Sequence, residues 1–317
     1  MKVFITREIP EIAIKLLNDN KFSVVIHKGN KKISRTELIK NIRDADGVIS
    51  LLSDSLDKSV ISEMKKCKVI ANYAVGFNNI DVKYAKGKGI VVTNTPDVLT
   101  DATADLAIAL ALSCARRLSE GENLIHNNKF TGWSPKLLLG YEMRNKIFGI
   151  IGAGRIGTAT AIRAYAFGTK IIYFSNSINP ELQNKTAARK VSLNYILKNS
   201  DFISVHLPLT EKTYHLLDKS KLMLLKNTAI IINSARGEII EEKALIELIK
   251  KKQIFAAGLD VYENETEINK ELLKLKNVVL LPHIGSATVE ARNKMAVLSA
   301  KNIINVLKGK MPITPVN

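Results

Sequence analysis

The sequence has little cysteine, with only Cys67 and Cys114 among 317 residues. Two thiols exclude a multi-bridge disulfide framework and a four-cysteine zinc site, and they fit a reducing compartment. No apolar run approaches the roughly 18 residues that a membrane-spanning helix needs. Residues 1–7 have a strand pattern without the apolar core and cleavage site of a signal peptide. We therefore expect a cytoplasmic protein with no membrane segment and no metal site.

Acidic residues are scarce relative to basic ones. The 30 Asp and Glu against 47 Lys and Arg give a formal net charge of +17. Such an excess can indicate a nucleic-acid or membrane-surface partner. However, the lysines are spread along the chain, and no helix-turn-helix, zinc-finger or aromatic-plus-basic RNA-binding motif occurs. We therefore expect a solvated basic surface, with neither nucleic acid nor membrane as a partner.

Strand and helix patterns alternate along the whole chain, which predicts parallel sheets covered by helices. The predicted strands are residues 2–5, 22–26, 47–52, 69–72, 90–94, 146–151, 170–174, 202–206, 229–233, 257–260 and 278–281. The predicted helices are residues 11–18, 35–42, 59–66, 101–118, 157–167, 193–198, 219–225, 243–251 and 289–307. Residues 121–144 are expected to be irregular. The fold class is therefore α/β, with two doubly wound parallel-sheet units; at 317 residues the chain is long enough for two domains.

Residues 152–157, GAGRIG, match the pattern G-x-G-x-x-G between a predicted strand and a predicted helix. The first glycine makes the tight turn, the second lets the backbone approach a pyrophosphate, and the third lets helix and strand pack closely. The N-terminus of the helix then faces the phosphates. The sequence therefore predicts a dinucleotide-binding site.

The fingerprint usually includes an acid at the end of the following strand, where it binds the ribose 2′-hydroxyl. Here that place holds Ser175, followed by Asn176 and Ser177. Because no carboxylate is present to repel a 2′-phosphate, the sequence favours NADP over NAD. No arginine follows directly, so NAD stays open as the alternative.

Three chemically useful residues follow strands of the second unit. Arg236 lies beyond the strand of residues 229–233, the acids Glu263 and Glu265 lie beyond that of residues 257–260, and His283 lies beyond that of residues 278–281. Open α/β sheets bind ligands at the carboxyl ends of their strands. We therefore expect an active site that contains an arginine, a carboxylate and a histidine.

The segments GAGRIG, NSARG, GLDVYENE and PHIGSAT, in this order, resemble the D-isomer-specific 2-hydroxyacid dehydrogenase family. Residues 72–81, 93–107 and 206–216 extend the resemblance over almost the whole chain. Within the family, residues 51–54 (LLSD), 133–135 and 139–141 are most similar to glyoxylate/hydroxypyruvate reductases. Leu51 stands where phosphoglycerate dehydrogenases typically have arginine, which argues against a phosphorylated substrate.

The resemblance implies a flavodoxin-like substrate-binding domain of residues 1–99 and 287–317, and a Rossmann dinucleotide-binding domain of residues 100–286. The implied reaction is the NAD(P)H-dependent reduction of a small 2-keto acid. Arg236 would bind the substrate carboxylate, and His283 would donate a proton to the carbonyl oxygen. Glu265 would hydrogen-bond His283, fix its tautomer and favour its protonated form.

The resemblance also implies the remaining contacts. Leu51 would form an apolar wall beside the substrate, and the backbone amides of Val75 and Gly76 would bind its carboxylate. The expected cofactor contacts come from the glycine-rich turn, the strand ends and the His283 loop: Thr103, Gly152, Gly154, Arg155, Ile156, Gly157, Ser175, Asn176, His206, Leu207, Pro208, Thr213, Ala235, Asp260, His283 and Gly285.

Family members are usually homodimers, and residues 121–144 resemble the arm that clasps the partner. Trp133 would then reach the substrate site of the neighbouring subunit. One departure from the family pattern is that Thr266 replaces the usual proline after Glu265 in the sequence. Two alternatives stay open at this point, a D-lactate-type or broad-specificity 2-ketoacid reductase and a non-catalytic, NAD-sensing corepressor-like protein.

Overall fold

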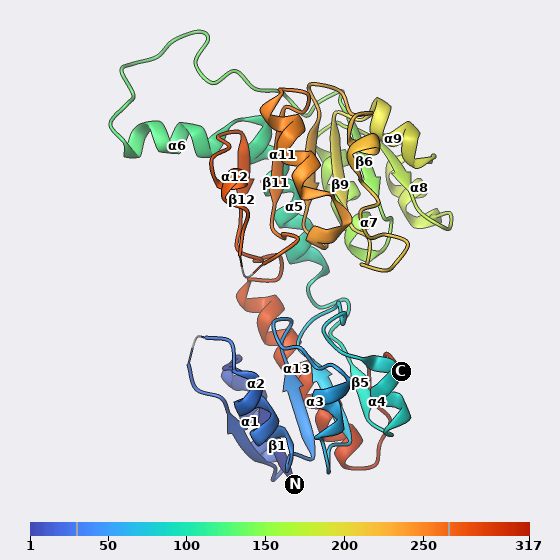
Figure 1. Cartoon of the computed structure of the whole chain (residues 1–317). Helices are drawn as coiled ribbons and strands as arrows, with labels where there is room; N and C mark the ends of the chain where they lie inside the picture. Colours follow the sequence, from blue (N-terminus) through green and yellow to red (C-terminus); the bar gives the residue numbers. More distant parts are fainter. Residues whose placement is uncertain (30, 266) are drawn as a thin grey trace. The chain divides into compact units, whose positions relative to one another are not determined.

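A computed structural model describes residues 1–29, 31–265 and 267–317 (Figure 1). Thr266 lies outside the described residues. The chain divides into two compact units, Met1–Leu99 with Ser286–Asn317, and Thr100–Gly285. In these residues no helix has the length and apolar character needed to cross a membrane, and no group of three or more His, Cys, Asp or Glu side chains could hold a metal ion.

The first unit has a five-stranded parallel sheet in the order β2-β1-β3-β4-β5. This is the flavodoxin-like order, and it confirms the predicted fold. β3 (GVIS) and β4 (VIAN) are buried throughout, which explains why both sequences are mainly apolar; each ends in one buried polar residue, Ser50 or Asn72. The strands are β1 (Lys2–Ile5), β2 (Ser23–Ile26), β3 (Gly47–Ser50), β4 (Val69–Asn72) and β5 (Val91–Thr93).

The final helix of the chain packs in this first unit, against α1 and against β3 and β4. It carries a stripe of buried residues that includes Met295, Ala296 and Ile303. Helix α4 was not predicted, because its six residues are too few for a helical period to be visible; Asp81 caps it by accepting a hydrogen bond from Tyr84. The helices are α1 (Glu11–Asp19), α2 (Arg35–Ile42), α3 (Lys58–Ser62), α4 (Val82–Gly87) and α13 (Val289–Leu307).

The second unit has a seven-stranded parallel sheet in the order β12-β11-β10-β9-β6-β7-β8. Chain order reverses between β6 and β9, as in a Rossmann fold, and this confirms the second predicted architecture. All carboxyl ends lie on one edge of the sheet because the strands are parallel. The strands are β6 (Ile147–Ile151), β7 (Lys170–Phe174), β8 (Arg189–Lys190), β9 (Phe202–Val205), β10 (Ile230–Asn233), β11 (Ala256–Leu259) and β12 (Val278–Leu280).

Two apolar clusters cover the faces of this sheet. One includes Leu110 of α5 and Ala161 of α7, and the other includes Leu197 of α9 and Leu245 of α11. The helices are α5 (Thr100–Ala115), α6 (Leu118–His126), α7 (Arg155–Ala166), α8 (Pro180–Thr186), α9 (Leu193–Asn199), α10 (Lys219–Leu222), α11 (Glu242–Lys250) and α12 (Lys270–Leu273).

The prediction of one helix over residues 101–118 and an irregular segment afterwards was wrong. Helix α5 ends at Ala115, Arg117 turns the chain with a left-handed φ of 53°, and α6 then runs from Leu118 to His126. None of the residues of α6 is buried, so its sequence shows no stripe facing a core. Figure 1 shows α6 and the loop after it extending away from the sheet of their own unit.

Candidate active site

The glycine-rich turn joins the end of β6 to α7. Gly152 has a φ of 101°, and α7 begins at Arg155, two residues before the predicted start. A Cβ atom on Gly157 would lie 2.1 Å from the Gly152 carbonyl oxygen, and one on Gly152 would lie 2.7 Å from the His206 carbonyl oxygen. Only glycine therefore fits at either position. The turn leaves the first amides of α7 facing the edge of the sheet, as binding a pyrophosphate requires.

The loop after β9 borders this turn. His206 forms a hydrogen bond to Ser204, with 2.9 Å between Nε2 and Oγ, and burial lowers the pKa of His206 to about 3. The imidazole is therefore neutral at physiological pH and adds no charge to the cofactor site. Thr213 holds the loop by donating to the Pro208 carbonyl over 2.7 Å and accepting from the Thr210 amide over 2.8 Å.

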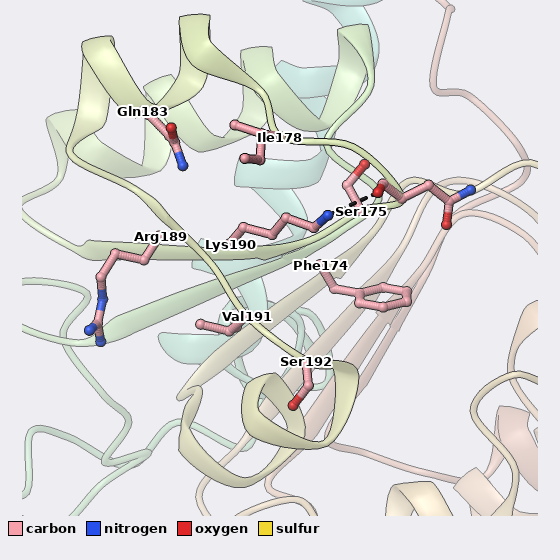
Figure 2. A pocket seen from close by; sticks show the side chains of 9 residues that line it. Phe174, Ser175, Ile178, Gln183, Arg189, Lys190, Val191 and Ser192 are labelled. Atoms are coloured by element: carbon pink, nitrogen blue, oxygen red, sulfur yellow. Dashed lines mark hydrogen bonds between the residues drawn. The ribbon is translucent and has the colours of Figure 1, made fainter.

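A pocket lies at the carboxyl end of β7, where the fingerprint places the ribose. Its lining includes the predicted Ser175 and Asn176, and also Arg189 and Lys190 of β8 (Figure 2). Sequence reasoning missed these two cations, because the edge strand that carries them has only two residues, both exposed. The lining residues are Phe174, Ser175, Asn176, Ile178, Gln183, Arg189, Lys190, Val191 and Ser192, none of them acidic.

His283 and Glu265 come together from loops after two different strands. His283 Nδ1 lies 2.8 Å from Glu265 Oε1 and 3.0 Å from Oε2. His283 follows β12 and has a left-handed φ of 53°, a conformation that residues other than glycine seldom adopt. Among the described residues, no side chain or carbonyl is hydrogen-bonded to Nε2. The carboxylate thus engages one ring nitrogen and leaves the other available for proton transfer.

Asp260 positions the loop that carries His283. Its fully buried carboxylate accepts hydrogen bonds from the backbone amides of Ile284 and Gly285, each over 2.7 Å. Burial raises the pKa of Asp260, and these two amides act in the opposite direction. Thr103 of α5 donates to the Gly285 carbonyl over 3.1 Å. The structure therefore places Asp260 and Thr103, two predicted cofactor contacts, around the turn that follows the histidine.

Arg236 lies just beyond β10, in a turn held by Asn233, whose side-chain amide donates to the Arg236 carbonyl over 2.8 Å. The guanidinium Nη1 donates to the Ala235 carbonyl over 2.6 Å. Burial lowers the pKa of Arg236, while the charges of Glu265 and Glu238 raise it. Within the part of the chain that the structure describes, no carboxylate lies within ion-pair distance of this guanidinium. Arg236 is therefore a half-buried cation with donors left for a ligand.

The predicted substrate residues of the first unit lie in loops after β3 and β4. The Leu51 amide donates to Asp54 over 2.8 Å. The carbonyls of Val75 and Gly76 accept hydrogen bonds from the side chains of Asn94 and Asn72, both over 2.8 Å. No described residue accepts a hydrogen bond from the amides of Val75 or Gly76. These two donors are therefore available to a ligand.

The remaining predicted residue, Trp133, lies in the loop after α6 and is 84% exposed. Other large apolar side chains in this region are also exposed: Leu118, Ile125, Phe130, Leu137 and Leu139. So much exposed apolar surface on one extended segment is typical of a protein interface.

Comparison with known proteins identifies the family of this chain. Residues 108–285 match the family model described as "D-isomer specific 2-hydroxyacid dehydrogenase, NAD binding domain". A glyoxylate reductase of Thermococcus litoralis is 48% identical over 100% of this chain and 96% of its own length. The crystal structure of the TT0316 protein from Thermus thermophilus superposes with a TM-score of 0.95 at 39% identity, covering 100% of both chains.

A third relative carries ligands. The NADPH-dependent glyoxylate/hydroxypyruvate reductase of Sinorhizobium meliloti, solved in complex with NADP and malonate, has a TM-score of 0.88 at 30% identity. The match covers 99% of this chain and 96% of that one. With sequence, fold and strand-end arrangement in agreement, this chain belongs to the D-isomer specific 2-hydroxyacid dehydrogenase family and is an oxidoreductase that depends on a nicotinamide dinucleotide.

Proposed function

We propose that this enzyme reduces glyoxylate and hydroxypyruvate to the corresponding 2-hydroxy acids, with NADPH as its preferred reductant. In this proposal the second unit binds the cofactor and carries Arg236, Glu265 and His283, and the first unit contributes further substrate contacts. The observation that carries the proposal is the pairing of His283 with Glu265 on the same sheet edge as Arg236, a cation without an ion-pair partner in the described chain. The similarity to glyoxylate reductases supports the substrate class.

Arg236 binds the carboxylate of the keto acid. A guanidinium stays charged and presents two parallel N–H donors that match a carboxylate. Its burial strengthens the interaction, since fewer water molecules compete for the same donors. In the first unit, the amides of Val75 and Gly76, unpaired within the described residues, are donors suited to a carboxylate, and Leu51 is proposed to limit the size of the group that the substrate carries beyond its carbonyl.

His283 donates the proton that the reaction needs. A reduced nicotinamide, when bound, would supply the hydride to the carbonyl carbon. His283 Nε2 gives its proton to the carbonyl oxygen, which becomes the hydroxyl of the product. Glu265 holds Nδ1 and stabilises the charged ring before transfer. The neutral imidazole then regains a proton from solvent.

The cofactor preference follows from the end of β7. Ser175 occupies the place of the ribose-binding acid, so no carboxylate there repels a 2′-phosphate. The glycine-rich turn fits the pyrophosphate, as the close approach of Gly152 and Gly157 indicates.

A substrate panel tests this function. Initial rates with glyoxylate, hydroxypyruvate, pyruvate and phenylpyruvate are measured with NADPH and with NADH. We expect the highest kcat/KM with glyoxylate or hydroxypyruvate and NADPH. A clear preference for pyruvate would indicate a D-lactate-type enzyme instead, and a strong preference for NADH would contradict the cofactor assignment. Absence of turnover with every pair would favour a non-catalytic, dinucleotide-sensing protein.

The proposal includes a homodimer formed through residues 121–144, in which Trp133 reaches the substrate site of the neighbouring subunit. The exposed apolar side chains of this segment support it, because a monomer would leave them in water. Size-exclusion chromatography with light scattering at micromolar concentration should give twice the 35.1 kDa chain mass. A monomeric mass would contradict the dimer. The cytoplasmic location expected from the sequence stays a prediction.

A further inference from the structure

The edge strand β8 brings two adjacent cations, Arg189 and Lys190, beside the end of β7. Arg189 is paired with Ile172, and Lys190 with Tyr173, one residue before β7 ends. Neighbouring residues of a strand point to opposite faces of the sheet, so the two side chains take different directions. In Figure 2 Lys190 extends toward Ser175, whereas the guanidinium of Arg189 points away from it.

One hydrogen bond holds the Lys190 ammonium at this place. Nζ donates to the backbone carbonyl of Asn176 over 2.9 Å, which ties the side chain to the loop that follows β7. An ammonium group has three donors, so two are left for an anion. The carbonyl contact already restricts the rotamers of Lys190. The side chain therefore loses less conformational entropy when it binds a ligand.

The surroundings of Lys190 favour an anion. None of the residues that line the pocket is acidic, while the hydroxyl of Ser175 and the amide of Asn176 supply neutral hydrogen-bonding groups. The fingerprint places the adenosine ribose at the end of this strand. A cation without a competing carboxylate at that position complements a phosphate on the ribose, which a lysine binds as a point charge.

We propose that Lys190 is the residue that binds the 2′-phosphate of NADP(H). It replaces the arginine that is missing after Ser175. The inference rests on the proposed use of NADPH and names the residue responsible for it. The cation comes from the next strand of the sheet instead of the loop itself. Arg189, which has the same charge and lies in the same strand, has no part in this contact.

Equilibrium binding in the absence of substrate tests the assignment. Dissociation constants of NADPH and NADH are measured by fluorescence titration for the wild type, Lys190→Ala, Lys190→Arg and Arg189→Ala. Loss of a hydrogen-bonded charge should weaken NADPH binding about 10-fold in Lys190→Ala. NADH binding should change by no more than about twofold, as for an ordinary surface substitution. Lys190→Arg should retain most of the NADPH affinity, and Arg189→Ala should resemble the wild type.

Two results would overturn the assignment: equal weakening of NADPH and NADH in Lys190→Ala, or equal weakening of NADPH in Lys190→Ala and Arg189→Ala. Thermal unfolding of each variant separates a local effect from loss of the fold. Rising salt should weaken NADPH binding more in the wild type than in Lys190→Ala, because a charge contact is screened. Failure of the proposed function can be told apart from failure of the Lys190 assignment. The first would appear as absence of turnover by the wild type, and the binding constants would still test the role of Lys190.

Discussion

Replacement of His283 by alanine is expected to lower kcat for glyoxylate reduction by about 10²–10⁴-fold, the usual effect of removing a positioned general acid. Glu265 holds Nδ1 at 2.8 Å, so the variant loses the proton donor and leaves this carboxylate without its partner. Steady-state rates over a range of pH, with saturating NADPH, measure the effect.

His27→Ala is the matched control for this substitution. His27 also presents Nδ1 to a glutamate, with 3.0 Å to Glu37 Oε1, but it lies after β2 in the first unit and has no proposed role. We expect its kcat to be close to that of the wild type. The expected loss is large. If the kcat of His283→Ala instead lies within a few-fold of that of the control, His283 is not part of the mechanism.

Replacement of Arg236 by glutamine is expected to reduce kcat/KM for glyoxylate by about 10²–10⁴-fold, because two hydrogen bonds between charged groups are lost. Arg236→Lys should recover only part of this loss, since an ammonium keeps the charge without the planar pair of donors. The assay is the initial rate as a function of glyoxylate concentration, with KM expected to rise in both variants.

Arg236→Gln should lose activity without losing stability. Burial lowers the pKa of Arg236 and no described carboxylate pairs with it, so the charge costs folding free energy. The midpoint of thermal unfolding should therefore be no lower than in the wild type, as for many functional residues. Arg43→Gln, which removes an exposed guanidinium paired with Glu63 at 2.8 Å, is the control and should leave kcat/KM unchanged. A large loss of stability in Arg236→Gln would mean that its activity loss reports unfolding.

Elements with a strong local signal were predicted with nearly correct bounds. The strand Val69–Asn72 and the helix Val289–Leu307 agree residue for residue. A buried strand has a mainly apolar sequence, and a long packed helix shows its period clearly. The short helix Lys270–Leu273 was missed, since four residues contain little more than one turn. Helix α6 was missed for another reason: no face of it is buried in the described chain.

The sequence by itself determined the two α/β units, the family and the glycine-rich turn. These depend on local requirements: apolar runs where strands are covered on both faces, and glycine where a Cβ atom would collide with a carbonyl oxygen. Motif order was enough to name Arg236, Glu265 and His283 as candidates. It could not show their contacts.

Only the tertiary structure decided which groups meet at the sheet edge. His283 and Glu265 are 18 residues apart, and Asp260 reaches the amide of Ile284 across 24 residues. Lys190 meets Asn176 because β8 pairs with β7, although two exposed residues carry almost no strand signal. Such contacts depend on strand pairing and register between segments that are distant in sequence. For this reason the sequence could name the residues of the site, but only the fold determines their geometry.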